Sequence, residues 1–255
     1  MARIAALIVV ALMLATGTAR AEPIAATPAC QQKHIAPQTL DYSQPLNLGQ
    51  LKNQIYFYVC SGTYDSELNK IATAARAYVE QRAGEVSKPA LVLDIDETSL
   101  SNAAVELASD FAYLSGIPCV LDPDSHAGAP ALKGPCGFGE WVALARAPAI
   151  DGTLALYQAA KQHKVAVFFI TGRHEGETAV TEANLKAAGF DHWDGLTLRP
   201  EGDKRTVIQY KSGEREKIAQ AGFTIIANVG DQYSDLSGGF AERAYKLPNP
   251  MYFIP

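Results

Sequence analysis

The chain has 255 residues, of which 48% are hydrophobic, 9% aromatic and 19% charged. This composition is that of an ordinary folded globular protein and excludes an intrinsically disordered chain, a collagen-like repeat and a coiled coil. The formal net charge is −5, from 22 basic and 27 acidic side chains. We expect no binding to a nucleic-acid polymer, because gripping a phosphate backbone needs clustered cations and the sequence has no basic block.

The first 21 residues have the layout of a secretory signal peptide. Arg3 precedes an apolar run over residues 4–15, and residues 19–21 (ARA) form a small-residue cleavage site. The run is too short to anchor the chain in a bilayer, and no later segment offers ~18 consecutive apolar residues. We therefore expect cleavage near Ala21, export to the periplasm or the medium, and no membrane span. A lipid anchor is not expected, because Cys30 lacks a preceding Leu-small-small sequence.

Four cysteines lie in the mature part of the chain: Cys30, Cys60, Cys119 and Cys136. Export favours disulfides, and the absence of a C-x-x-C pair argues against a metal site. Of the three possible pairings, we prefer Cys119–Cys136 with Cys30–Cys60. The loop between Cys119 and Cys136 is rich in proline and glycine, so a bridge would order it, with a stabilisation of roughly 3 kcal/mol. Four free buried thiols are the alternative.

The predicted elements alternate between helices and strands. Residues 22–50, rich in proline, glutamine and alanine, are expected to form an irregular arm, and apolar spacing predicts a helix over Asp65–Gly84. Continuous apolar runs over 89–96, 165–171 and 224–230 indicate strands that are buried on both faces. Helices are predicted between them, over 152–163, 175–189 and 212–222. This alternation predicts an α/β fold, a Rossmann-like parallel sheet flanked by helices.

The interval between the first two predicted strands is too long for a simple crossover. It contains two cysteines, several prolines and Trp141. We expect a small cap, inserted at about residues 99–164 within a domain of residues 51–255. Trp141, Phe111 and Tyr113 are expected in the core of this cap, and stacking on an aromatic leaving group is the alternative role.

Polar side chains follow each of the three apolar runs. Asp94 and Asp96 end the first run, Thr171 ends the second, and Asp231 and Asp235 follow the third. Ligands of doubly wound sheets bind at the carboxyl ends of the strands, so we expect these side chains to converge. Such a cluster of carboxylates would repel itself without a cation, and oxygen ligands of this kind suit Mg²⁺.

These segments resemble motifs of the haloacid dehalogenase superfamily. LDIDETSLSN is similar to its first motif, FFITGR to the second and GDQYSDL to the fourth. YKSGERE followed by AGFTIIANVGDQYSDLSG resembles one branch, that of bacterial class C acid phosphatases, plant acid phosphatases and vegetative storage proteins. The resemblance covers about residues 50–250. The chain departs from class C enzymes in lacking a lipid-attachment cysteine, and TGR is nearer the plant type than their Ser-Asn-Arg.

The resemblance implies a role for each residue. Asp94 would be the nucleophile that forms an aspartyl-phosphate. Asp96 would protonate the leaving group, deprotonate the attacking water and give its backbone carbonyl to Mg²⁺. Thr171 would bind a phosphoryl oxygen. Asp231 would complete the metal site, and Asp235 would bind the metal or orient its waters.

A lysine is needed to neutralise the developing phosphoryl charge, and two are candidates. We prefer Lys211 because it lies 20 residues before Asp231, at the start of the helix predicted over 212–222, where the family has its third motif. Amide groups of the helix N-terminus would assist it there. Lys204 is the reserve candidate.

The sequence therefore predicts an exported, Mg²⁺-dependent acid phosphatase that hydrolyses small phosphate monoesters. A non-catalytic storage or binding protein on the same fold is one alternative. Transfer of phosphate to an alcohol through the same intermediate is the other.

Overall fold

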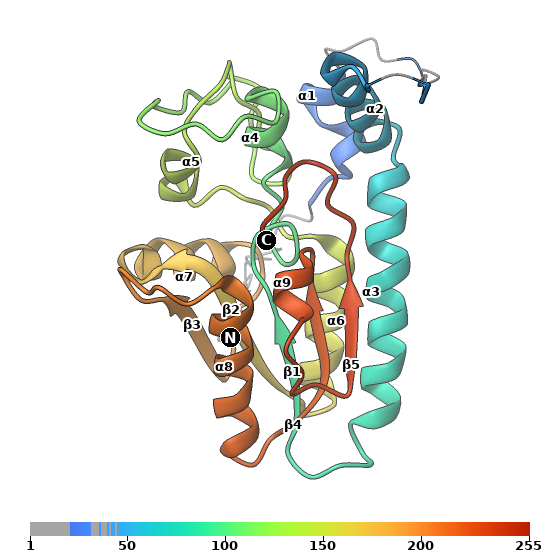
Figure 1. The fold of residues 1–255 in the computed structure, drawn as a ribbon, viewed down its shortest axis with the longest axis vertical. Coiled ribbons are helices and arrows are strands. Elements are labelled where there is room, and N and C mark those ends of the chain that lie inside the picture. Colours follow the sequence, from blue (N-terminus) through green and yellow to red (C-terminus); the bar gives the residue numbers. More distant parts are fainter. Residues whose placement is uncertain (1–20, 32–35, 37–39, 41, 44) are drawn as a thin grey trace, which may run out of the picture.

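The computed structural model describes residues 21–31, 36, 40, 42–43 and 45–255. These residues form one sheet of five parallel strands in the order β3-β2-β1-β4-β5. The expected α/β fold with a parallel sheet is confirmed, and Figure 1 shows the strands side by side. The strands are β1 (Pro89–Leu93), β2 (Ala166–His174), β3 (Gly195–Arg199), β4 (Thr224–Gly230) and β5 (Arg243–Lys246).

Two strands were not predicted, and both lie at the edges of the sheet. β3 reads GLTLR and β5 reads RAYK, so neither contains the continuous apolar run that marks the three central strands. An edge strand keeps part of its surface in solvent and tolerates polar residues, which removes the sequence signal.

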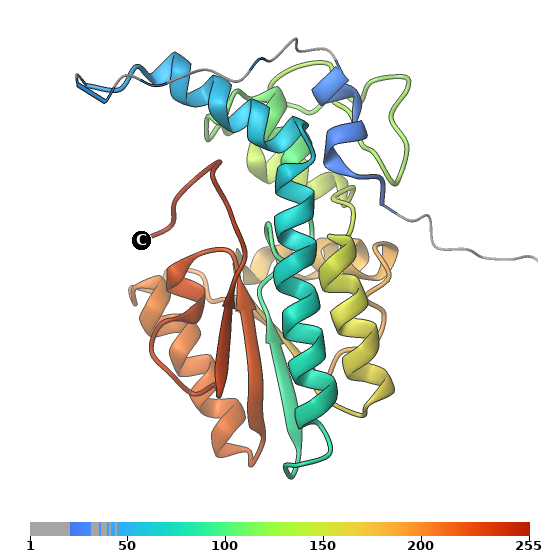
Figure 2. The same ribbon diagram turned by 90° about the vertical axis from the view of Figure 1, so that its right-hand side faces the viewer.

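Helices surround the sheet in two layers and extend beyond its carboxyl end. Figure 2 shows α3 and α6 running alongside each other over one face of the sheet. α8 packs against the opposite face, where Tyr210 joins a small apolar cluster with β1, β2 and β4. The helices of the described residues are η1 (Ile24–Ala26), α1 (Pro28–Gln31), α2 (Leu48–Cys60), α3 (Thr63–Arg82), α4 (Ala103–Ala108), α5 (Phe138–Leu144), α6 (Asp151–Gln162), η2 (Glu175–Glu177), α7 (Thr178–Ala187), α8 (Val207–Gln220) and α9 (Tyr233–Leu236).

The central strand β1 is buried because both of its faces are covered. Leu91 and Leu93 point into the larger core with α3 and α6, whereas Ala90 and Val92 point into the cluster beneath α8. A strand with this environment needs an apolar residue at every position, which is why its sequence is a continuous apolar run. Because β1 is packed on both faces, the residues that follow it have a defined position at the carboxyl edge of the sheet.

The segment between β1 and β2 divides into two parts. α4, α5 and their connecting loops lie above the carboxyl ends of the strands, whereas α6 packs beside α3 in the helix layer (Figure 1). Within the upper part, Trp141 is buried and Phe111 is half-buried, but Tyr113 is 85% exposed. We use the word cap for residues 101–150, which form this upper part.

The N-terminal arm is more regular than expected. It contains η1 and α1, and α2 begins at Leu48, where the side chain of Asn47 caps the helix by accepting bonds from the amides of Gly49 and Gln50. α2 was not predicted, although an asparagine before a helix is a recognised N-terminal signal.

Both expected disulfides are present, Cys30–Cys60 and Cys119–Cys136. The first ties α1 to the end of α2, and the second closes the cap loop ahead of α5. The predicted signal peptide falls on residues 1–20, outside the described residues, with only Ala21 inside them. Across the part of the chain that is described, no helix combines the length and the apolar character needed to cross a bilayer.

Candidate active site

The loop after β1 holds the first two aspartates at the edge of the sheet. The amide of Asp94 donates to Val229 O of β4 at 3.0 Å, so the residue is still tied to the neighbouring strand. The chain then turns tightly around Ile95, whose carbonyl accepts the amides of Ser99 and Leu100, each at 2.8 Å. The hydroxyl of Ser99 donates back to Asp94 O at 2.6 Å. These bonds fix the backbone that presents Asp94 and Asp96.

Three buried carboxylates meet at this edge. One oxygen from each of Asp94, Asp231 and Asp235 lies within 4.8 Å of the others. Asp231 follows β4, and Asp235 is turned back toward it because its Oδ2 accepts the amide of Gln232 at 2.8 Å. Glycine is required at position 230, since a Cβ there would lie 2.4 Å from the Cβ of Asp235. The cluster therefore combines the ends of β1 and β4, as the sequence predicts.

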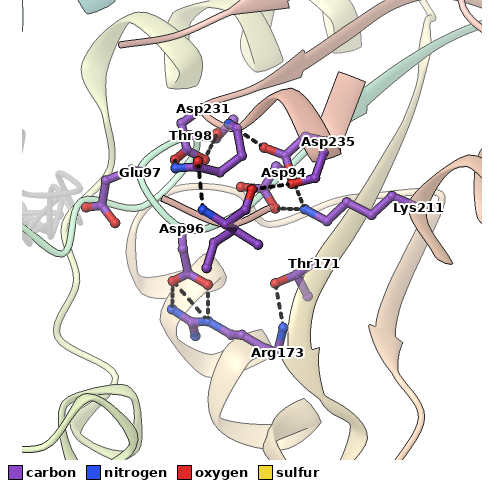
Figure 3. Close-up of polar contacts among 12 residues, drawn as sticks. Asp94, Asp96, Glu97, Thr98, Thr171, Arg173, Lys211, Asp231 and Asp235 are labelled. Carbon is purple, nitrogen blue, oxygen red and sulfur yellow. Dashed lines mark hydrogen bonds and ion pairs between the residues drawn. The ribbon is translucent and has the colours of Figure 1, made fainter. Parts of the chain in front are cut away.

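Lys211 lies among these carboxylates, as Figure 3 shows. Its Nζ donates to Asp94 Oδ1 at 2.5 Å and to Asp235 Oδ1 at 2.6 Å, and its side chain is 5% exposed. Burial alone would lower its pKa, but the charges of Asp235 and Asp94 raise the pKa above its usual value. Lys211 is therefore held as a cation next to the expected nucleophile. The reserve candidate, Lys204, is exposed.

One argument for Lys211 was wrong, although the residue occupies the expected place. α8 begins at Val207, after a capping box in which Thr206 and Gln209 bond each other's backbone amides. Lys211 is thus one turn inside the helix and not at its N-terminus, so amides of the helix N-terminus do not assist it. The T-x-x-Q pattern at 206–209 carried the signal for the earlier start.

The charge of the cluster fits a divalent cation. Three carboxylates against one ammonium leave two negative charges uncompensated. Burial, followed by repulsion from Asp235, raises the pKa of Asp231 to about 7, and burial also raises the pKa of Asp94 well above its usual range. Ionised carboxylates in such a position need a cation, and an all-oxygen donor set is the kind that Mg²⁺ prefers.

Asp96 has a different partner. Its carboxylate pairs with the guanidinium of Arg173, with Nη2 at 2.7 Å from Oδ1 and Nε at 3.1 Å from Oδ2. Burial tends to raise the pKa of Asp96, but the charge and hydrogen bonds of Arg173 bring the pKa below its usual value. Figure 3 shows this pair below Asp94, apart from the Asp231 and Asp235 side chains. No role for Arg173 was predicted from the sequence, although this residue ends the TGR segment that contains Thr171.

Thr171 lies on β2 close to this pair. Its Oγ1 accepts the amide of Arg173 at 3.1 Å, which leaves the hydroxyl proton to be donated to another acceptor. β2 continues past Thr171 to His174, so the threonine is inside the strand and not at its end. The residue is fully buried.

Asp231 is held by three side-chain donors, its neighbour Gln232 and two residues from other parts of the chain. Its Oδ2 accepts the amides of Gln232 at 2.7 Å and Asn249 at 2.8 Å, and its Oδ1 accepts the hydroxyl of Thr98 at 3.2 Å. Asn249 belongs to the C-terminal segment, which nothing in the sequence linked to the site. Its own Oδ1 accepts the amide of Met251 at 2.8 Å, so it also shapes this segment.

Glu97 is buried beside the site but points away from the other carboxylates in Figure 3. Its two oxygens accept the amide of Asn102 at 2.5 Å and the hydroxyl of Tyr252 at 3.0 Å. Burial, with repulsion from Glu106 and Asp96, raises the pKa of Glu97 to about 8. Glu97 thus ties the loop after β1 to the C-terminal segment.

Comparison with known proteins assigns the chain to a family. Residues 18–255 match the family described as HAD superfamily, subfamily IIIB (acid phosphatase). The chain is 36% identical over 200 residues to "Acid phosphatase 1" of Solanum lycopersicum. The alignment covers 77% of this chain and 72% of that protein.

Two further relatives match over a shorter region. "Stem 28 kDa glycoprotein" of Glycine max is 41% identical over 121 residues, and "Vegetative storage protein 1" of Arabidopsis thaliana is 35% identical over 122 residues. These alignments cover 46% and 48% of this chain, and 48% and 45% of the relatives, so this chain spans about half of their length.

The fold is similar to that of a solved structure, the class C acid phosphatase from Bacillus anthracis. The TM-score is 0.59 at 19% identity, and the match covers 80% of this chain and 86% of the other. The buried acidic cluster at the carboxyl edge of a parallel sheet and the family match over almost the whole chain lead to one conclusion: the chain belongs to the acid phosphatases of HAD superfamily subfamily IIIB, which are phosphoric monoester hydrolases.

Proposed function

We propose that this protein is an exported, Mg²⁺-dependent acid phosphatase that hydrolyses small phosphate monoesters through an aspartyl-phosphate intermediate. The observation that carries the proposal is the contact of Lys211 with both Asp94 and Asp235 inside a buried carboxylate cluster. The carboxylate of Asp94 and a phosphate dianion would repel each other during in-line attack. The ammonium of Lys211, 2.5 Å from Asp94 Oδ1, reduces this repulsion.

The nucleophilic step is assigned to Asp94. One carboxylate oxygen of Asp94 attacks phosphorus, a new P–O bond forms, and the bond to the ester oxygen breaks with its electron pair. Lys211 neutralises charge on the phosphoryl group, and Thr171 donates its hydroxyl proton to a phosphoryl oxygen.

Proton transfer is assigned to Asp96. Because Arg173 lowers the pKa of Asp96, an acidic working pH is needed to supply its protonated form. In that form Asp96 gives its proton to the departing ester oxygen, which leaves as an alcohol. In the second half of the reaction it takes a proton from water as that water attacks phosphorus, which releases inorganic phosphate and restores Asp94. Arg173 holds the carboxylate of Asp96 in place between these two transfers.

Asp94, Asp231 and Asp235 are proposed to hold Mg²⁺, together with the backbone carbonyl of Asp96. When bound, the cation neutralises charge between the nucleophile and the phosphate. Thr98, Gln232 and Asn249 keep the carboxylate of Asp231 oriented toward this position.

Export is proposed from the signal-peptide layout of residues 1–21, and two disulfides support it because they persist in oxidising compartments. Mass analysis of protein recovered from the periplasm or the medium should give a chain that begins near Glu22. A full-length chain confined to the cytoplasm would contradict this part of the proposal.

A storage role remains the second candidate, because two relatives carry the names of a stem glycoprotein and a vegetative storage protein. The presence of Asp94, Asp96, Thr171, Lys211 and Asp231 favours the enzyme, since a storage protein has no need of a buried acidic cluster, whose ionised form costs free energy. Phosphotransfer differs from hydrolysis only in the acceptor of the phosphoryl group. An assay with added alcohol distinguishes the two reactions, because transfer gives a new phosphate ester in place of inorganic phosphate.

The test is a phosphatase assay on purified mature protein with phenyl, sugar and nucleotide monoesters. Activity should disappear in excess chelator and return with Mg²⁺. Asp94→Asn should abolish turnover and the acid-stable phosphoprotein seen after rapid quenching, because an amide does not attack phosphorus usefully. Asp124→Asn, an exposed aspartate of the cap, is the matched control. Activity within tenfold of wild type in Asp94→Asn, or full activity in chelator, would refute the mechanism.

A further inference from the structure

The side chain of Asn102 connects two carboxylates of the site. Its Nδ2 donates to Asp96 Oδ1 at 2.9 Å and to Glu97 Oε2 at 3.0 Å, and the residue is fully buried. Asn102 precedes α4, at the point where the chain leaves the loop after β1 and enters the cap. It is therefore the junction between the cap and Asp96.

Trp141 determines which way the Asn102 amide points. The indole Nε1 of Trp141 donates to Asn102 Oδ1 at 2.8 Å. An indole N–H is only a donor and the ionised carboxylate of Asp96 is only an acceptor, so the amide satisfies Trp141 and Asp96 together in one orientation alone. With Trp141 in place, the NH₂ group of Asn102 must face Asp96 and Glu97.

Trp141 lies on α5, a helix of the cap that also contacts α7. The Cys119–Cys136 disulfide closes the loop two residues before α5 begins, and Ser109 Oγ donates to Cys136 O at 3.3 Å. Trp141 is 1% exposed. The indole therefore reaches Asn102 from a helix of the cap.

Asp96 is supported from two sides, and the supports converge on one oxygen. Its Oδ1 accepts Arg173 Nη2 at 2.7 Å as well as Asn102 Nδ2 at 2.9 Å. Among the described residues, its Oδ2 accepts only Arg173 Nε, at 3.1 Å. Oδ2 accepts fewer hydrogen bonds than Oδ1, so it is the oxygen that can carry a proton. The direction in which Oδ2 points depends on how the bonds to Oδ1 hold the carboxyl group.

We propose that Trp141 and Asn102 are positioning residues that aim Oδ2 of Asp96 at the leaving group, so that the cap controls the proton-transfer step. This inference rests on the proposed function, in which Asp96 is the proton donor. Arg173 bonds both oxygens of the Asp96 carboxylate from one side. The Asn102 amide adds a bond to Oδ1 from another side, which restricts rotation of the carboxylate.

Trp141→Phe is the direct test, because phenylalanine keeps an aromatic ring and removes only the N–H donor and part of the ring. A nitrophenolate leaves without being protonated, whereas an alkoxide does not. General acid catalysis contributes about 10²–10⁴-fold, and misaiming the donor should remove part of it. We expect kcat/KM to fall about tenfold or more for an alkyl phosphate and less than about threefold for para-nitrophenyl phosphate.

Trp193→Phe is the matched control. Trp193 packs against Phe169 of β2 at 6.0 Å between ring centroids, and Lys186 of α7 lies 5.3 Å from the centre of its ring. This variant should leave the ratio of the two substrates unchanged, even if it lowers the melting temperature as much as Trp141→Phe does. Equal losses on both substrates in Trp141→Phe, or no loss, would overturn the proposal.

A double-mutant cycle gives a second, independent outcome. Asn102→Ala should itself reduce turnover of the alkyl ester, and adding Trp141→Phe should then change the substrate ratio no further, because the amide that Trp141 orients is absent. Additive effects would refute the link between the two residues. If Asp94→Asn and Asp96→Asn retain activity, the proposed function fails instead, and that result is distinguishable from a failure of this inference alone.

Discussion

Replacing Lys211 by methionine tests the centre of the site, because methionine keeps an unbranched side chain, one atom shorter, and removes its charge. The ammonium contacts Asp94 at 2.5 Å and Asp235 at 2.6 Å in a buried position. Removing one preorganised donor to a developing anion costs about 10²–10³-fold in rate, by analogy with oxyanion holes. We expect a loss of that size in kcat/KM at saturating Mg²⁺.

The same change also affects stability, and the size follows from the burial of the pair. Breaking a buried ion pair by removing one partner costs about 3–5 kcal/mol, because the remaining charges are left uncompensated. Here Asp94 and Asp235 both lose their cation, so the melting temperature of the metal-free variant should fall clearly. Added Mg²⁺ should restore part of this stability but little of the activity, since the cation cannot replace the lysine at the phosphoryl group.

Two controls separate these effects. Lys204→Met removes a charge that is exposed, so it should change neither rate nor melting temperature appreciably. Lys211→Arg should not restore activity, because a planar guanidinium does not reproduce a compact ammonium between two carboxylates. The inhibition constant of inorganic phosphate should rise in Lys211→Met, because the ammonium that would contact the phosphoryl group is absent. If Lys204→Met were inactive and Lys211→Met normal, the assignment of the lysine would be wrong, although the aspartate assignments would survive.

Three further predictions concern residues around this centre. Arg173→Lys should lower kcat about tenfold or more, because one ammonium cannot reproduce the paired bonds to Asp96. Asn249→Ala should weaken Mg²⁺ binding about 10- to 100-fold in calorimetry, as is usual when a residue that orients a ligand is lost. Metal-free protein should lose stability from pH 5 to pH 8.5, since the folded pKa values of Asp231 and Glu97 are raised to about 7 and about 8.

The sign of the pH effect follows from the proton balance. Both carboxyls stay protonated in the folded protein at pH values where the unfolded chain has released its protons. Their contribution to stability is therefore present below about pH 4 and is lost as the pH rises through 7 and 8, by at most about 1.4 kcal/mol per group and pH unit. Saturating Mg²⁺ should reduce this slope, and a melting temperature that rises over this range in chelator would contradict the reasoning.

Arg173→Lys and Asn249→Ala each have a control, in which the same substitution is made at a surface position. Arg76→Lys changes an arginine that pairs with Glu80 on the surface of α3, and it should leave kcat unchanged. Asn53→Ala, an exposed position of α2, should leave the affinity for Mg²⁺ unchanged. Unaltered Mg²⁺ affinity in Asn249→Ala would show that the C-terminal segment does not orient Asp231.

Much of the fold was predictable from the sequence because the central strands have one kind of environment. β1, β2 and β4 lie between layers of helices, so each reads as an apolar run that no surface segment shares. Once these strands are located, their carboxyl ends fix where Asp94, Asp96, Asp231 and Asp235 lie, whereas Thr171 lies inside β2, which continues to His174. The disulfides were also predictable. The proline- and glycine-rich loop between Cys119 and Cys136 favours a bridge that orders it, and the two remaining cysteines then pair with each other.

Contacts between distant segments were decided only by the tertiary structure. Asp96 and Arg173 are 77 residues apart, and nothing local in either segment indicates that they pair. Asn249 reaches Asp231 because the C-terminal segment crosses the edge of the sheet, and Trp141 reaches Asn102 because the cap folds back over it. The sequence by itself determined which residues follow β1 and β4, since the burial of a strand is reflected in its local hydrophobicity. Which partners orient them depends on how layers pack, and that is a property of the assembled chain.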